Sequence, residues 1–192
     1  MKEMKKWKIV ALCTVLACLS IVASGTLAYF TAQETAHNVI TSGGVDIELK
    51  EWVDEDKTVP FPEDGIKNVM PAAEVTKIVE VTNTGASAAW VRVSVTKTIK
   101  LADGVEGTPD PELIALDINT EDWIKQGDFY YYSKALQPGK TTEPLFTTVT
   151  FAPEMGNMYQ NSEAEIKVQA DAVQVANNGD TVLKAGGWPE SV

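Results

Sequence analysis

The sequence predicts an all-β protein: an antiparallel jelly-roll-like (Greek-key) β-sandwich preceded by an N-terminal signal helix. Apolar and polar residues alternate with a period of two in several segments, and turn-forming Gly, Pro and Asn stand between them. Helical patterns do not alternate with these segments, so an antiparallel sandwich of seven or more short strands is favoured over an α/β fold.

Six segments have strand character, and each is followed by a turn or a loop. They are residues 45–52 (VDIELKEW), 74–85 (EVTKIVEVTNTG), 88–101 (AAWVRVSVTKTIKL), 128–136 (DFYYYSKAL), 143–151 (EPLFTTVTF) and 164–175 (AEIKVQADAVQV). The third segment is the clearest, because its valines share one face while Trp90, Arg92 and Ser94 line the other. Pro111 stands at a plausible first helical position of DPELIALDI, where one or two helical turns are expected.

The N-terminus has the pattern of a secretory signal peptide. Four lysines in MKEMKKWK precede an apolar run over residues 9–22, and small residues follow it. Cleavage is expected after Ala28, since Thr26 and Ala28 then hold the two positions that require small side chains, and Tyr29 becomes the new N-terminus. The alternative is an uncleaved membrane anchor over residues 9–30.

Removal of residues 1–28 changes what the surface can bind. Both cysteines, Cys13 and Cys18, are lost with this segment, which excludes disulfides, cysteine-bound zinc and cysteine nucleophiles from the mature chain. Four Lys and one Glu also leave, so 16 basic and 27 acidic residues become 12 and 26, and the net charge moves from −11 to −14. Such a surface disfavours nucleic acid and anionic lipid, and suits solubility outside the cell or divalent-cation binding between molecules.

Catalytic motifs are scarce, and the chain is predicted not to be an enzyme. His37 is the single histidine, so the H-E-x-x-H zinc motif is absent. Residues 54–57 (DEDK) lack the glycine and the downstream glutamate of a calcium loop, so no cofactor is assigned, although calcium stays possible. The aromatic run 129–132 could bind carbohydrate or protein, but more often such rings only stiffen a sheet through cross-strand pairs.

The segment GTLAYFTAQETAHNVITSGGVDIEL resembles the start of the TasA/camelysin (CalY) family of secreted Gram-positive proteins. The segments VMPAAEVTKIVEVTNTGASAAWVRVSV, FYYYSKALQPGKTTEPLFTTVTF and EIKVQADAVQV resemble later parts of that family, so that the resemblance covers nearly the whole chain. One departure is Pro71-Ala72, where the family usually has Pro-Gly. The resemblance implies a jelly-roll-like sandwich, export through a SipW-type signal peptidase, and assembly into extracellular matrix fibres that support biofilm.

Residues 29–44 are the candidate assembly element. They form a flexible segment between the signal peptide (1–28) and the sandwich (45–176), with a C-terminal tail at 177–192. An unpaired sheet edge offers free N–H and C=O groups, which a strand from another molecule can fill. We therefore expect donation of residues 29–40 to a neighbouring copy, with Tyr29, Phe30, Val39 and Ile40 as anchors. The alternatives are a monomeric surface adhesin or carbohydrate-binding module that uses residues 130–132, and a camelysin-like metallopeptidase.

Overall fold

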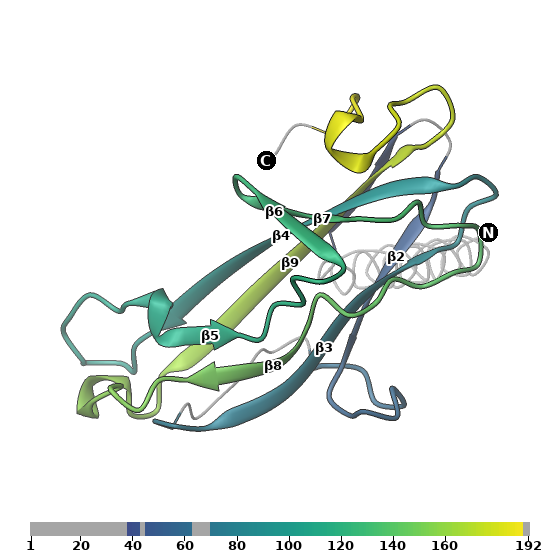
Figure 1. Cartoon of the computed structure of the whole chain (residues 1–192). Helices are drawn as coiled ribbons and strands as arrows, with labels where there is room; N and C mark the ends of the chain where they lie inside the picture. The colour runs from purple at the N-terminus through teal and green to yellow at the C-terminus, as the bar shows by residue number, and fades with distance from the viewer. Residues whose placement is uncertain (1–37, 43–44, 63–69, 190–192) are drawn as a thin grey trace, which may run out of the picture. The chain divides into compact units, whose positions relative to one another are not determined.

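The computed structural model describes residues 38–42, 45–62 and 70–189, so the predicted signal helix lies outside the described residues. These residues form two β-sheets and three short 3₁₀ turns, which confirms the all-β class (Figure 1). The strands are β1 (Asn38–Ser42), β2 (Ile47–Trp52), β3 (Glu74–Asn83), β4 (Ala89–Lys100), β5 (Ile114–Leu116), β6 (Trp123–Gln126), β7 (Phe129–Tyr132), β8 (Phe146–Phe151) and β9 (Glu163–Gln174), and the 3₁₀ turns are η1 (Pro111–Leu113), η2 (Asn157–Tyr159) and η3 (Val182–Lys184).

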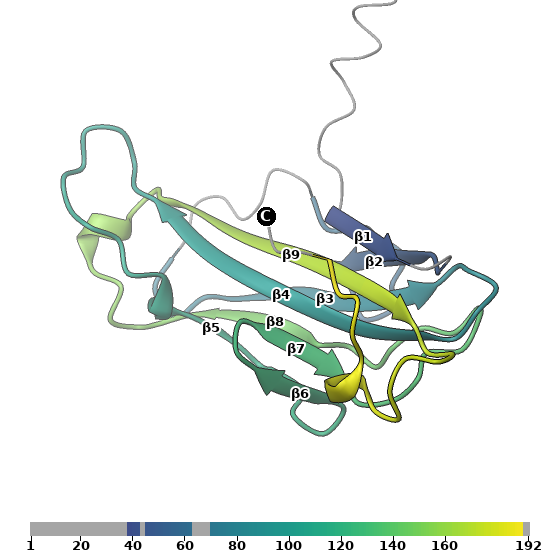
Figure 2. The same cartoon turned by 90° about the horizontal axis from the view of Figure 1, so that it is seen from above.

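The five-stranded sheet has the order β1-β9-β4-β7-β6, and the four-stranded sheet has the order β2-β3-β8-β5. The longest ladder of the five-stranded sheet joins β4 to β9, which lie side by side along the length of the sandwich (Figure 2). This antiparallel pairing runs without a break from Ala89↔Gln174 to Lys100↔Glu163. The alternation predicted for β4 is confirmed, because Val91 and Val93 are buried in the core while Thr96 and Thr98 are exposed on the opposite face.

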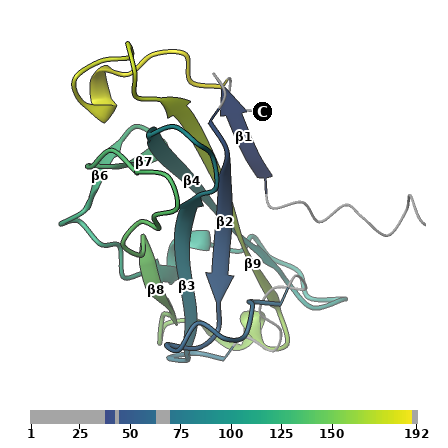
Figure 3. The same ribbon diagram turned by 90° about the vertical axis from the view of Figure 1, so that its right-hand side faces the viewer.

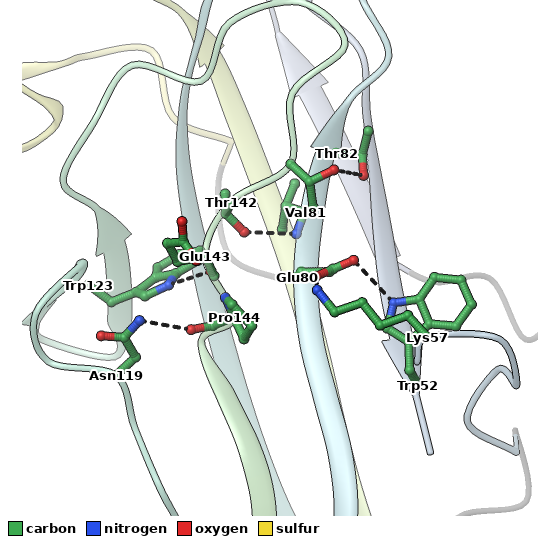
Figure 4. Close-up of polar contacts among 11 residues, drawn as sticks. Trp52, Lys57, Glu80, Val81, Thr82, Asn119, Trp123, Thr142, Glu143 and Pro144 are labelled. Atoms are coloured by element: carbon green, nitrogen blue, oxygen red, sulfur yellow. Dashed lines mark hydrogen bonds and ion pairs between the residues drawn. The ribbon is translucent and has the colours of Figure 1, made fainter. Parts of the chain in front are cut away.

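The core lies between the two sheets and is built from alternate residues of each strand. Its largest fully buried side chains include Trp123, Phe146, Phe151, Ile114 and Leu145. The Trp123 ring packs at 5.1 Å from that of Tyr132, and its indole N–H donates to the Glu143 carbonyl at 3.0 Å (Figure 4). This bond satisfies the one polar atom of an otherwise apolar ring, as a buried indole requires.

Two strands were not predicted from the sequence, and a third lies in the segment predicted to be donated. Strand β1 lies within residues 29–44, the candidate donor strand, whereas β6 lies in a segment that was not assigned to any element. Strand β5 falls where helical turns were expected, since the helical part after Pro111 is only the 3₁₀ turn η1. The Asp110 carboxylate caps this turn by accepting the Glu112 N–H at 2.9 Å, and the chain becomes extended at Ile114.

The Pro71-Ala72 pair forms the same kind of turn as Pro138-Gly139. In each, the proline holds the second position and the next residue has a positive φ, +59° at Ala72 and +70° at Gly139. The closing hydrogen bonds are Ala73 N–H to Met70 O at 3.2 Å and Lys140 N–H to Gln137 O at 3.0 Å. A positive φ costs an alanine energy that a glycine does not lose. The unusual residue of the first turn is therefore strained.

We predict that Ala72→Gly raises the free energy of unfolding by about 1 kcal/mol, because it removes the left-handed alanine conformation. Gly139→Ala is the matched reverse change, and should lower it by a similar amount, since a Cβ there meets no atom within 4 Å and only backbone strain is added. Urea titration of both variants measures the two effects. Changes of the same sign would contradict this account of the turns.

Candidate functional site

The first candidate site is the border of the five-stranded sheet formed by β1 and β9 (Figure 3). Strand β1 pairs in parallel with the C-terminal half of β9, from Asn38↔Gln169 to Ser42↔Val173. On the same side of β9, residues 163–168 have no strand partner within the described part of the chain. This stretch presents backbone N–H and C=O groups that another strand can pair with.

Of the four predicted anchor residues, two lie within the described residues and two lie outside them. Val39 pairs with Ala170 and Ile40 with Asp171, both within the same chain. Tyr29 and Phe30, the cleavage residues Thr26 and Ala28, and His37 lie outside the described residues. The sandwich therefore begins earlier than the predicted residue 45, because β1 joins it. Only Val39 and Ile40 are apolar in this strand, which is too short a pattern to reveal a period of two.

The aromatic run on β7 is occupied by contacts inside the molecule. Tyr132 belongs to the main core, whereas Tyr131 lies on the opposite face of the sheet, with its ring 5.7 Å from that of Trp188. Both tyrosines are buried, and Tyr130 is half-buried against the core. These rings stiffen the sheet and hold the C-terminal tail, so that the geometry does not favour their use as a glycan-binding surface.

A second candidate is a set of charged side chains around β3. The Glu80 carboxylate accepts the indole N–H of Trp52 at 3.2 Å and forms an ion pair with Lys57 (Figure 4). Lys77 is 2% exposed, pairs with Glu51 at 2.9 Å, and has its ammonium 3.8 Å from the centre of the Phe61 ring. No sequence motif marks these groups, although Lys77 is the single lysine of β3.

Burial lowers the pKa of Lys77, and its pairing with Glu51 opposes that effect. The unfolded chain therefore keeps the Lys77 proton to a higher pH than the folded chain. The free energy of unfolding should rise with pH between the lowered pKa and the ordinary value of 10.5. This pair is a structural feature that stabilises the strand arrangement only while both partners are present.

We predict that Lys77→Met and Glu51→Gln each lower the free energy of unfolding by about 3 kcal/mol, because each leaves one charge without its partner. The double variant should lose clearly less than the sum of the two, as measured by urea titration of all four proteins. Lys134→Met is the control, since it removes an exposed ion pair with Asp122, and should have little effect. Additive losses would show that the two side chains are not coupled. The alkaline rise in stability should also disappear in Lys77→Met.

The described residues contain no cluster of side chains suited to binding a catalytic metal. They contain neither histidine nor cysteine, and no three Asp or Glu side chains among them converge as metal ligands. Within the same residues no helix is long and apolar enough to cross a membrane. The site that the geometry supports best is therefore the β1–β9 border.

Comparison with known proteins gives one match. The model of a family described as camelysin metallo-endopeptidase matches residues 3–103, which is 101 of the 192 residues. No curated protein and no solved structure matches the chain. The match spans most of the predicted signal region and the part of the chain that holds β1 to β4.

Proposed function

Since the chain belongs to the camelysin metallo-endopeptidase family of secreted or surface proteins of Gram-positive bacteria, we propose that it is a fibre-forming subunit of the extracellular matrix. A SipW-type signal peptidase would release it by cleavage after Ala28. Copies would then assemble head to tail by exchange of the N-terminal strand.

The observation that carries this proposal is the β1–β9 border. Strand β1 has five residues and a parallel pairing, which is slightly less stable per residue than an antiparallel one. A neighbour's β1 would make the same contacts with β9 as the molecule's own β1. Exchange therefore costs little beyond association, as in domain swapping, and a head-to-tail contact that does not close generates a filament.

The open part of β9 gives a donated strand more to pair with. Asn38 pairs with Gln169, an offset of 131 positions. The same register carried toward the N-terminus would set residues 32–37 opposite residues 163–168, which have no strand partner on that side in the described structure. Tyr29 and Phe30 would then project past the end of β9. A strand donated from residue 29 has the length to cover this border, which supports extending the donated segment from residues 29–40 to residues 29–42.

The peptidase activity in the family's description is not proposed for this chain. A catalytic zinc is usually held by three His, Glu, Asp or Cys side chains. His and Cys are missing from the described residues, and no three of their carboxylates come together. The residues that the structure describes therefore offer no donor set for such a metal.

We predict that the chain beginning at Tyr29 forms filaments, whereas the chain beginning at Gly44 stays monomeric, because it has an acceptor border and no strand to donate. Negative-stain microscopy and sedimentation at equal concentration measure the difference. Val39→Asn with Ile40→Asn in the Tyr29 chain is the matched variant of equal length, and should assemble at least tenfold more slowly, because Asn is disfavoured in strands relative to the β-branched Val and Ile.

The Gly44 chain also tests the direction of assembly. It can accept a strand but cannot pass one on, so its addition at a small molar fraction should shorten the filaments of the Tyr29 chain. Filaments of equal number and length from both chains would overturn strand exchange. Monomers from both under all conditions would overturn the proposed fibre function.

A further inference from the structure

The outer face of the five-stranded sheet is covered at one end by the C-terminal latch, which we define as residues 175–189. The latch includes η3, and packs Val182 into a small apolar cluster with Trp90, Tyr131 and Val173. The Trp90 indole N–H donates to the carbonyl of Asn178 at 3.1 Å, which fixes the start of the latch to β4. The latch therefore belongs to the folded structure and is not a loose tail.

Two further contacts close the latch on itself. The Asn178 side-chain amide donates to the Gly186 carbonyl at 3.0 Å and accepts the Gly186 N–H at 2.8 Å. The Trp188 indole N–H donates to the Ala185 carbonyl at 3.0 Å, which orients the ring toward the sheet. Both ends of the latch thus have defined positions.

Arg92 of β4 is the centre of the contact between latch and sheet. Its guanidinium lies 3.8 Å from the centre of the Phe129 ring and 4.9 Å from that of Trp188. It pairs with Asp171 at 2.8 Å and donates to the carbonyl of Pro189 at 2.7 Å. Asp171 is 1% exposed, so this pair is kept from water partly by the latch. A charge pair in such surroundings depends on every partner being in place.

The half of β9 that holds β1 is also the half that is linked to the latch, directly through Val173 and through Arg92 at Asp171. Gln169, Asp171 and Val173 pair through the backbone with Asn38, Ile40 and Ser42. On their side chains, Gln169 donates to Asp171 at 3.2 Å, Asp171 pairs with Arg92, and Val173 packs in the Val182 cluster. The N-terminal strand and the C-terminal latch therefore depend on the same half of β9.

We propose that the C-terminal latch controls the release of β1. With the latch closed, the C-terminal half of β9 is fixed from its outer face, and β1 stays paired to it. With the latch open, water reaches the Arg92–Asp171 pair, this half of β9 opens more often, and β1 leaves with it as one cooperative unit. The consequence for assembly rests on the proposed function, but the coupling between latch and strand does not.

The test is hydrogen–deuterium exchange on the chain beginning at Tyr29, which retains every residue of the two sheets, isolated as the monomer by gel filtration and measured before filaments form. Trp188→Ala removes one of the two rings on Arg92, and should speed amide exchange in residues 38–42 by about tenfold, the scale of a desolvated cation–π contact. Exchange at Val95 and Thr96, in the middle of β4, should stay unchanged, because these residues pair with Val168 and Lys167, outside the half of β9 that opens. Leu183→Ala is the matched control within the latch, since this side chain is 42% exposed, and should leave β1 unaffected.

Asn178→Ala is the second variant, because it opens the latch without removing any group from the face of the sheet. It should act on β1 in the same direction as Trp188→Ala. Unchanged protection of β1 in both variants, with faster exchange in the latch, would overturn the coupling. Equal acceleration in β1 and in the middle of β4 would also overturn it, since the latch would then be a general stabiliser. Faster exchange in β1 with no filaments from any chain would keep the coupling and reject the fibre function.

Discussion

The pairing of β4 with β9 is the interaction on which the other features of the structure depend. It is an unbroken antiparallel ladder of twelve residue pairs at the centre of the five-stranded sheet. Its inner face supplies much of the core, and its outer face carries the Arg92–Asp171 pair and the latch. Strand β1 pairs with β9 on the side that faces away from β4. Because the side-chain period is two, a shift of β4 by one residue against β9 would turn Arg92 toward the core, away from Asp171, and Val91 and Val93 toward the outer face.

Much of the fold could be predicted because the long strands have one buried face. In β4, Val91, Val93 and Val95 alternate with polar residues, and in β9 exposed and buried residues alternate from Glu163 to Val168, so a period of two is visible in each. β5 and β6 have three and four residues, too few for a period to be read. β1 has only two apolar residues, and its pairing with β9 is a contact between distant parts of the chain, so the candidate border could not be located from sequence. The sequence indicated the donated segment and its anchors Tyr29, Phe30, Val39 and Ile40, but not the strand with which they pair.

The two buried cations, Lys77 and Arg92, have the same kind of surroundings, which no local sequence pattern predicts. Lys77 lies against Glu51 and the Phe61 ring, and Arg92 lies against Asp171 and the rings of Phe129 and Trp188. A carboxylate offsets part of the loss of water, and the face of a ring offers a further favourable contact to the cation. In both cases the ring comes from another part of the chain, after residue 60 or in the C-terminal latch. These cations therefore attach peripheral segments to the sheets. This role can be recognised only in the folded structure.

The edges of the two sheets differ in how they are protected from pairing with other strands, and this difference explains why the β9 border is suited to assembly. The end of β2 is covered by residues 59–61, through a Trp52–Pro60 bridge and the Phe61 N–H bond to Glu51. At β5, the Lys97 ammonium donates to the carbonyl of Ile114. β6 has four residues, and short edge strands resist pairing with other strands. Among the described residues, the part of β9 before Gln169 continues a strand of the longest ladder, carries exposed Glu165 and Lys167 on one face, and has no covering segment on this side. A strand that reaches this border adds to the longest ladder of the molecule, so assembly there extends an existing sheet and needs no new one.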